Sequence, residues 1–279
     1  MTSTLLLTAL TMLAFAANSV LCRLALSHTA IDPAGFTLVR IASGATMLWV
    51  LANVIGKRKG VGGSWKGAAT LVIYAIAFSL AYVSLPAGTG ALLLFGAVQV
   101  TMIATGLVKG ERLALAQWAG LTVALAGLVT LVAPGVSAPP PLGAALMVLS
   151  GVFWGIYSLL GRGATDPVAT TAGNFLRAAP MALIPAIVLM GQLTPDPMGI
   201  LYAVLSGTLA SGCGYILWYS VLPRLSAAQG ASVQLSVPVI AALAGAALMG
   251  EALSLRLGIA SAAVLGGIAL VIAGRRRRL

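Results

Sequence analysis

Residues 88–133 decide the fold class, because they hold two long apolar runs joined by only four residues. They read GTGALLLFGAVQVTMIATGLV, then KGER, then LALAQWAGLTVALAGLVTLVA. Each run has 21 residues, and an α-helix of about 20 residues crosses the ~30 Å hydrocarbon layer of a bilayer. A strand of a membrane barrel would instead alternate in polarity over about ten residues. The stretch therefore predicts two transmembrane helices joined by a tight turn.

The same pattern continues over the rest of the chain. Of its 279 residues, 60% are hydrophobic and 8% are charged, whereas soluble domains carry about 25% charged residues. Breakers such as Asp32-Pro33 and Pro86 divide the apolar runs. Without a turn at Pro86 there would be nine spans. We predict an all-α membrane protein with ten transmembrane helices, at residues 4–25, 35–55, 66–85, 88–108, 113–133, 142–160, 170–190, 198–221, 228–248 and 255–274.

The positive charges predict the orientation of these spans. If the N-terminus lies inside, thirteen of the 16 Lys and Arg fall on the inner side, and only Arg23, Arg40 and Arg256 fall on the outer side. Cytoplasmic loops carry an excess of Lys and Arg. We therefore expect a multi-pass protein of the cell (inner) membrane with both termini in the cytoplasm. The net charge of +11 lies in loops and at the C-terminus, so the expected surroundings are the lipid bilayer and not nucleic acid.

The two halves of the chain resemble each other. Residues 88–133 align with 228–273 at a constant shift of 140, so that Gly110-Glu111 meets Gly250-Glu251. Near matches at similar shifts continue through the earlier spans, which indicates an internal duplication. We expect two repeats of five helices, 1–137 and 138–279.

An odd number of spans forces two homologous repeats to insert in opposite senses. The predicted architecture is therefore a pair of inverted five-helix repeats, which is typical of secondary transporters. Such a transporter exposes one central site to either side by exchanging the conformations of its halves. We expect the chain to act as a monomer on a small-molecule solute.

The repeated motif also carries a family resemblance. The Gly-Glu-x-Leu-x-Leu elements at Gly110 to Leu115 and Gly250 to Leu255, with the paired Arg23 and Arg162, resemble the EamA-type drug/metabolite transporters. Within that superfamily the chain looks most like the YddG-type exporters of aromatic amino acids. The resemblance implies a basket of ten helices with a central cavity, lined by the first, third, fourth, sixth, eighth and ninth spans, and alternating access.

Polar and aromatic side chains within the spans are the candidates for substrate binding. Polar groups are costly in lipid and usually face a cavity or another helix. Tyr74, Phe78 and Tyr82 recur every four residues and so share one face of a helix. Packing between helices is the alternative role for each candidate. The full set is Asn18, Ser19, Tyr74, Phe78, Tyr82, Gln99, Trp154, Tyr157, Ser158, Tyr219 and Gln234.

Tyr82 and Tyr219 have matching positions in the two halves. Each lies four residues before a proline, Pro86 and Pro223. Inversion of the repeat places Tyr82 near the outer end of its span and Tyr219 near the inner end of its own. We expect them to act as paired gate elements on opposite sides of the membrane.

All five acidic residues fall in loops or at helix ends, at Asp32, Glu111, Asp166, Asp196 and Glu251. The sequence therefore offers no carboxylate in mid-membrane to couple transport to protons. We expect Glu111 and Glu251 to cap turns against Arg112 and Arg256. The pairs Asp32 with Arg40 and Asp166 with Arg177 are expected to be surface ion pairs.

The sequence favours transport over catalysis. The chain has one His and two isolated Cys, which cannot form a metal site, and it has no Walker loop for ATP. We expect no enzyme activity and no cofactor. The predicted function is a secondary transporter that exports or exchanges small amphipathic metabolites, aromatic or neutral amino acids above all. A broad drug or metabolite exporter is the first alternative, and a channel or scaffold is the second.

Overall fold

The computed structural model describes residues 2–55, 62–110, 112–135, 138–161, 164–188, 194–221, 224–225 and 233–275. These residues form helices and short connections without a strand. The bounds of the helices are α1 (Thr2–His28), α2 (Pro33–Ile55), α3 (Trp65–Tyr82), α4 (Ala87–Val108), α5 (Leu115–Val132), α6 (Pro141–Leu160), α7 (Pro167–Val188), α8 (Pro197–Leu205), α9 (Gly214–Val221), α11 (Ser236–Met249) and α12 (Leu255–Arg275), with a π-helix, η2 (Ser206–Cys213), between α8 and α9.

Within the described part of the chain, nine helices are long and apolar enough to cross a membrane. One of them combines α8, η2 and most of α9, at Pro197–Trp218. Helix α11, Ser236–Met249, is apolar but shorter. The expected break at Pro86 is present, because α3 ends at Tyr82 and α4 begins at Ala87. The all-helical, multi-span character expected from the sequence is thus confirmed.

Acidic side chains cap the N-termini of several helices, and this corrects part of the expected pairing of charges. The Oδ1 atom of Asp32 accepts hydrogen bonds from the backbone N–H groups of Ala34 and Gly35, at 2.9 and 2.8 Å. Asp166 accepts in the same way from Ala169 at 2.9 Å. Both therefore cap helix N-termini, a role that contributes about 1 kcal/mol each. In the described part of the chain, neither acid forms the surface ion pair expected with Arg40 or Arg177.

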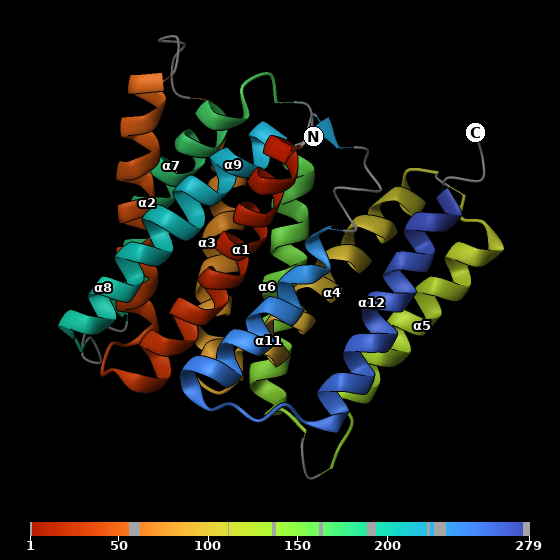
Figure 1. Cartoon of the computed structure of the whole chain (residues 1–279). Helices are drawn as coiled ribbons and strands as arrows, with labels where there is room; N and C mark the ends of the chain where they lie inside the picture. The colour runs from red at the N-terminus through yellow and green to blue at the C-terminus, as the bar shows by residue number, and fades with distance from the viewer. Residues whose placement is uncertain are drawn as a thin grey trace.

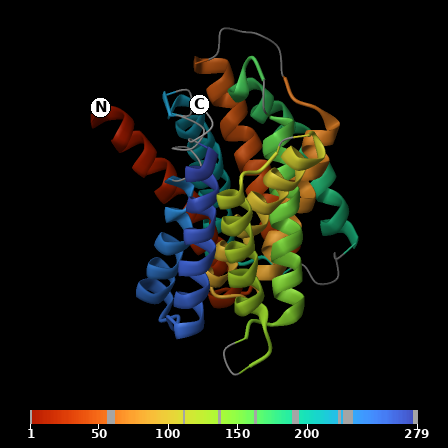
Figure 2. The ribbon, with the colours of Figure 1, turned by 90° about the vertical axis from the view of Figure 1, so that its right-hand side faces the viewer.

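The helices form one bundle whose first helix begins and whose last helix ends at the same end (Figure 1). We call this the terminal end and the opposite one the distal end. Helices α5 and α12 lie side by side in both ribbon views (Figures 1 and 2). Figure 1 shows them at one margin of the bundle, with α2 and α7 at the other. A Cβ atom on Gly120 of α5 would lie 2.5 Å from the carbonyl oxygen of Gly267 of α12. The glycines therefore let these two backbones touch, as is common between membrane helices.

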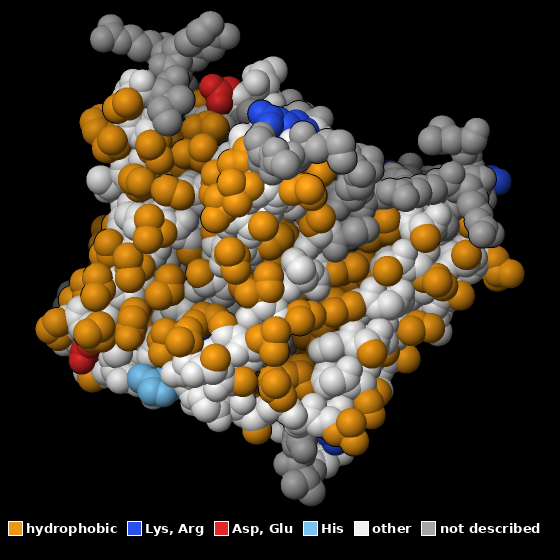
Figure 3. All heavy atoms as spheres, viewed as in Figure 1, with side chains coloured by type: hydrophobic (Ala, Val, Ile, Leu, Met, Phe, Trp, Pro, Cys, Tyr) orange, Lys and Arg blue, Asp and Glu red, His pale blue; other side chains and the backbone are white. Residues whose placement is uncertain are grey.

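The outer surface of the bundle suits lipid. Large apolar side chains on several helices are exposed, among them Leu5, Val54, Leu115 and Leu255. On the face that Figure 3 shows, hydrophobic side chains cover the sides of the helices, and the coloured charged groups lie towards the two ends. Apolar sides with charged ends are the pattern expected of helices in a bilayer.

Candidate substrate cavity

A small cavity lies in the interior of the bundle and partly opens to solvent. Its wall combines polar and aromatic side chains from helices far apart in the sequence. The lining residues are Phe15, Asn18, Ser19, Arg40, Tyr74, Leu94, Phe95, Trp154, Ala210, Ser211 and Tyr215. A concave, mainly apolar space with a few converging polar groups is typical of small-molecule sites.

Four of the candidate residues predicted from the sequence line this cavity, namely Asn18, Ser19, Tyr74 and Trp154. Tyr157 and Phe78 lie directly behind the wall, because their rings contact Trp154 at 5.5 Å and Tyr74 at 5.5 Å between centroids.

The other candidates lie elsewhere. Ser158 donates its hydroxyl hydrogen bond to the carbonyl of Trp154 on its own helix. Gln99 is buried in α4 and Gln234 is half-buried before α11, and neither belongs to the cavity wall. Tyr82 is fully buried near the distal end of α3. The side chain of Tyr219, like all of Glu111, is outside the described residues.

The hydroxyl group of Tyr74 is the centre of a polar network beside the cavity. It accepts hydrogen bonds from Nη2 of Arg40 at 2.9 Å and from Nδ2 of Asn18 at 3.3 Å. The Oδ1 atom of Asn18 in turn accepts from the hydroxyl of Ser206 at 2.7 Å. The network thus joins α1, α2, α3 and the first residue of η2.

The location of Arg40 differs most from the sequence prediction. It was assigned to the outer surface, yet its side chain is only 3% exposed and borders the cavity. Its guanidinium carbon lies 5.3 Å from the ring centroid of Tyr74 and 5.0 Å from that of Phe78. Because α2 begins at Pro33, Arg40 lies about two turns inside the helix. An arginine within an apolar run was the available sequence signal for a functional position.

Aromatic rings form the other part of the wall. The ring of Trp154 lies 4.8 Å from that of Tyr74 and 5.3 Å from that of Tyr215. Phe15 extends the group, with its centroid 6.2 Å from Tyr215. Phe15, Arg40 and Tyr215 were not among the candidate residues predicted from the sequence. The contact of Phe15 with Tyr215 joins residues 200 positions apart, which no local pattern reports.

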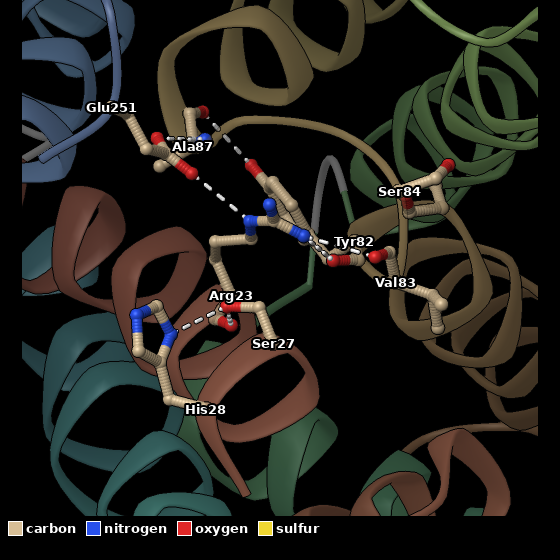
Figure 4. A network of polar contacts seen from close by, with 9 residues as sticks. Arg23, Ser27, His28, Tyr82, Val83, Ser84, Ala87 and Glu251 are labelled. Carbon is tan, nitrogen blue, oxygen red and sulfur yellow. Dashed lines mark hydrogen bonds and ion pairs between the residues drawn. The ribbon is translucent and has the colours of Figure 1, made fainter. Parts of the chain in front are cut away.

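A second polar network lies towards the distal end (Figure 4). Nε of Arg23 forms an ion pair with Oε1 of Glu251 at 2.9 Å. Nη1 of the same arginine donates to the carbonyl groups of Tyr82 and Val83, at 2.9 and 3.0 Å. The other carboxylate oxygen of Glu251 accepts from the backbone N–H of Ala87 at 2.7 Å. We call this group the distal network.

The distal network replaces the expected pair of Glu251 with Arg256. Arg256, the second residue of α12, donates instead to the carbonyl groups of Ala133 and Pro134 after α5. Glu251 follows Gly250, whose φ of 65° is left-handed, and the chain turns its carboxylate toward α1 and α4. The ion pair therefore connects the start of the α11–α12 connection to α1 and to the α3–α4 turn.

Comparison with known proteins shows the class of protein to which this chain belongs. The pattern of the EamA-like transporter family matches residues 141–273. An uncharacterized protein of Pseudomonas aeruginosa is 59% identical over 276 residues, which is 99% of this chain and 96% of that one. The chain belongs to the EamA-like transporter family, and it is a multi-pass membrane protein of a class that carries out membrane transport.

More distant relatives include an uncharacterized transporter of Archaeoglobus fulgidus, 28% identical over 85% of this chain and 86% of that one. A probable terminal-alkyne amino-acid exporter of Streptantibioticus cattleyicolor is 27% identical over 78% of this chain and 76% of that one. One solved crystal structure superposes with a TM-score of 0.71 at 23% identity, covering 100% of this chain and 99% of that one. This last likeness establishes a shared fold.

Proposed function

We propose that the chain is a secondary transporter that exports or exchanges small amphipathic metabolites, with aromatic and other neutral amino acids as its favoured substrates. The observation that carries the proposal is the interior cavity, in which the rings of Phe15, Trp154 and Tyr215 share a wall with Asn18 and Arg40. Such a wall offers an apolar surface and a polar end to the same small solute. The name of the relative from Streptantibioticus cattleyicolor, a probable amino-acid exporter, supports this substrate class.

Ring stacking gives the reason to prefer aromatic solutes, as in the YddG-type exporters. Contacts between aromatic rings contribute about 0.5–1.5 kcal/mol beyond the burial of area. The tryptophan has three aromatic neighbours, at centroid distances of 4.8, 5.3 and 5.5 Å, so the ring is held in place before the substrate binds. A fixed surface of this kind favours aromatic over aliphatic side chains several-fold.

Alternating access by inverted repeats is the proposed mechanism, with residues 1–137 and 138–279 as the repeats. In this proposal the predicted span 228–248, to which α11 belongs, is the ninth of ten spans. The start of α1 and the end of α12 at the same end of the bundle support an even number of spans (Figure 1). The charge bias of the loops supports a cytoplasmic location for that terminal end.

The distal network would then be the closed outer gate. It bridges α1, the α3–α4 turn and the residue that follows Gly250. Tyr82, proposed above as an outer gate element, is fully buried here and donates a hydrogen bond from its hydroxyl to the carbonyl of Ala87 at 3.3 Å. Both features favour an outward-closed conformation of the cavity.

Counterflow in proteoliposomes that contain only this protein tests the proposal. Liposomes loaded with unlabelled phenylalanine should accumulate labelled phenylalanine from outside. Alanine and cationic drugs should compete less well. Equal competition by alanine and phenylalanine would contradict the aromatic preference. Competition by drugs alone would favour the broad drug exporter. Flux without counterflow would favour a channel.

A matched pair of tryptophan variants tests the site. Trp154→Ala removes the ring that borders the cavity and should weaken phenylalanine counterflow several-fold to about tenfold. Trp118→Ala removes a ring on α5 that is 48% exposed on the surface of the bundle, and it should leave the substrate preference unchanged. Equal effects of the two substitutions would contradict the assignment of the cavity.

A further inference from the structure

Among the described residues, no carboxylate pairs with the guanidinium group of Arg40. Its Nη2 atom donates to the hydroxyl of Tyr74, which is a neutral acceptor. Its Nη1 atom is buried and has no hydrogen-bond partner among the described residues. The side chain as a whole is 97% buried, since only 3% of it is exposed.

The acids of the described chain are engaged elsewhere. The residues that line the cavity include no Asp or Glu in the part of the chain that the structure describes. Glu251 pairs with Arg23. Asp32 directly precedes α2 and caps the N-terminus of that helix. The rings of Tyr74 and Phe78 compensate part of the charge by cation–π contacts. Burial of a charge without an opposite charge and a complete set of hydrogen bonds is strongly unfavourable.

We propose that Arg40 binds the carboxylate of the transported solute, so that the substrates of this cavity are small organic carboxylates, amino acids included, that carry an apolar or aromatic group. The proposal rests on the proposed transport function and adds the chemical group that the cavity requires. A carboxylate that enters the cavity meets Arg40 at its wall. One hydrogen bond, from Nη2 to Tyr74, holds the guanidinium in the structure, and Nη1 is left to donate to a carboxylate oxygen.

The remainder of the wall fits the rest of such a molecule. Trp154 and Tyr74 are 4.8 Å apart between ring centroids, so an apolar group can lie against Trp154 while the carboxylate meets the guanidinium beside Tyr74. The hydroxyl of Ser211 and the amide of Asn18 line the same space and can bond to an amino group. A solute with only a positive charge would be repelled by the guanidinium in a site of low dielectric constant.

The chain contains a matched arginine for comparison. Arg177 is half-buried and is the eleventh residue of α7, whereas Arg40 is the eighth of α2. The Nη1 atom of Arg177 donates to the carbonyl groups of Gly62 and Gly173, at 2.7 and 2.9 Å. Its charge is therefore met by backbone oxygens, and it does not line the cavity. Arg177→Gln should leave the preference among ligands as it is in the wild type.

The test measures binding to the purified full chain by thermal stabilisation, with phenylalanine, 3-phenylpropionate, phenylalaninamide and phenethylamine as ligands. The two carboxylates should bind the wild type about ten- to a hundredfold more tightly than the amide and the amine. In Arg40→Gln this preference should fall to within about twofold, and Arg40→Lys should recover part of it. Arg177→Gln should keep the full preference.

Each contrary result overturns the inference. Binding of the amide or the amine as tightly as phenylalanine, or no binding of either carboxylate to the wild type, would exclude a carboxylate site. An unchanged preference for carboxylates in Arg40→Gln would show that Arg40 is not part of the site. If that variant does not fold, the relative affinities of the four ligands for the wild type test the carboxylate site. Counterflow is measured separately, so a protein that binds carboxylates but moves none of them would refute the transport function and leave the site.

Discussion

At the scale of single residues, the hydroxyl group of Tyr74 holds the polar side of the cavity together. It receives hydrogen bonds from Arg40 and Asn18, at 2.9 and 3.3 Å, which come from two other helices. The ring of Tyr74 separately contacts Trp154 and Phe78. The hydroxyl and the ring thus have different roles, and a substitution can remove the first without the second.

Tyr74→Phe should therefore destabilise the protein while it preserves the aromatic wall. The substitution leaves Nη2 of Arg40 and Nδ2 of Asn18 buried without their acceptor, which costs about 1–3 kcal/mol. The thermal unfolding midpoint in detergent measures the loss. Thr130→Ala is the control, because its hydroxyl is exposed on α5 and bonds only to its own helix. A Tyr74→Phe protein as stable as the control would contradict the role of this hydroxyl.

At the scale of elements, the sequence predicted the helices well because lipid imposes their length and their apolar composition. The break at Pro86 and the helix start after Asp32-Pro33 follow from local backbone chemistry, and both occur in the structure. The cavity was only partly predictable. Trp154 and Tyr74 were found as aromatic residues within spans, whereas Arg40 was counted as a loop charge although it lay inside the expected span 35–55.

The π-helix η2 was not predictable from apolar runs, because its composition resembles that of the α-helices on either side. It matters for the cavity because Ser206, Ala210 and Ser211 belong to it. Its close approach to α2 depends on Gly207. A Cβ atom there would overlap the carbonyl oxygen of Arg40 and the hydroxyl of Ser43. The glycine therefore sets the distance between η2 and the helix that carries Arg40.

Gly207→Ala should separate η2 from α2. We expect a loss of about 1–3 kcal/mol, as in other overpacked interiors, together with weaker carboxylate binding. Gly266→Ala in α12 is the matched control, because a Cβ atom at that position has nothing within 4 Å. The control should be neutral or stabilise the protein by up to about 1 kcal/mol through helix propensity. Equal thermal unfolding midpoints for the two variants would contradict the close packing of α2 on η2.

At the scale of the whole molecule, the two polar networks lie in different parts of the bundle. The network around Tyr74 lies beside the cavity, and the distal network joins α1, the α3–α4 turn and Glu251 (Figure 4). The distal network bridges parts of the chain that are 228 positions apart, Arg23 and Glu251. In the proposed alternating-access mechanism, an exchange between two conformations breaks these contacts, so their strength would set the balance between the two states.

Glu251→Gln should shift that balance toward a conformation open at the distal end. The substitution removes the ion pair with Arg23, while the amide oxygen of the new side chain can still accept from the N–H of Ala87. A loss of about 1.4 kcal/mol from the closed state raises the open fraction about tenfold. A cysteine introduced at Ser19, in the cavity wall and one turn from Arg23 on α1, reports the opening in a background without Cys22 and Cys213.

An impermeant thiol reagent added from outside should label this reporter about tenfold faster in Glu251→Gln than in the parent. Arg256→Gln is the control, because Arg256 lies in the same region but bonds only to the carbonyl groups of Ala133 and Pro134 among its described contacts. It should not change the labelling rate. If the two substitutions changed the rate equally, the Arg23–Glu251 pair would be an ordinary stabilising contact, and closure of the distal end would depend on the packing of Tyr82 instead.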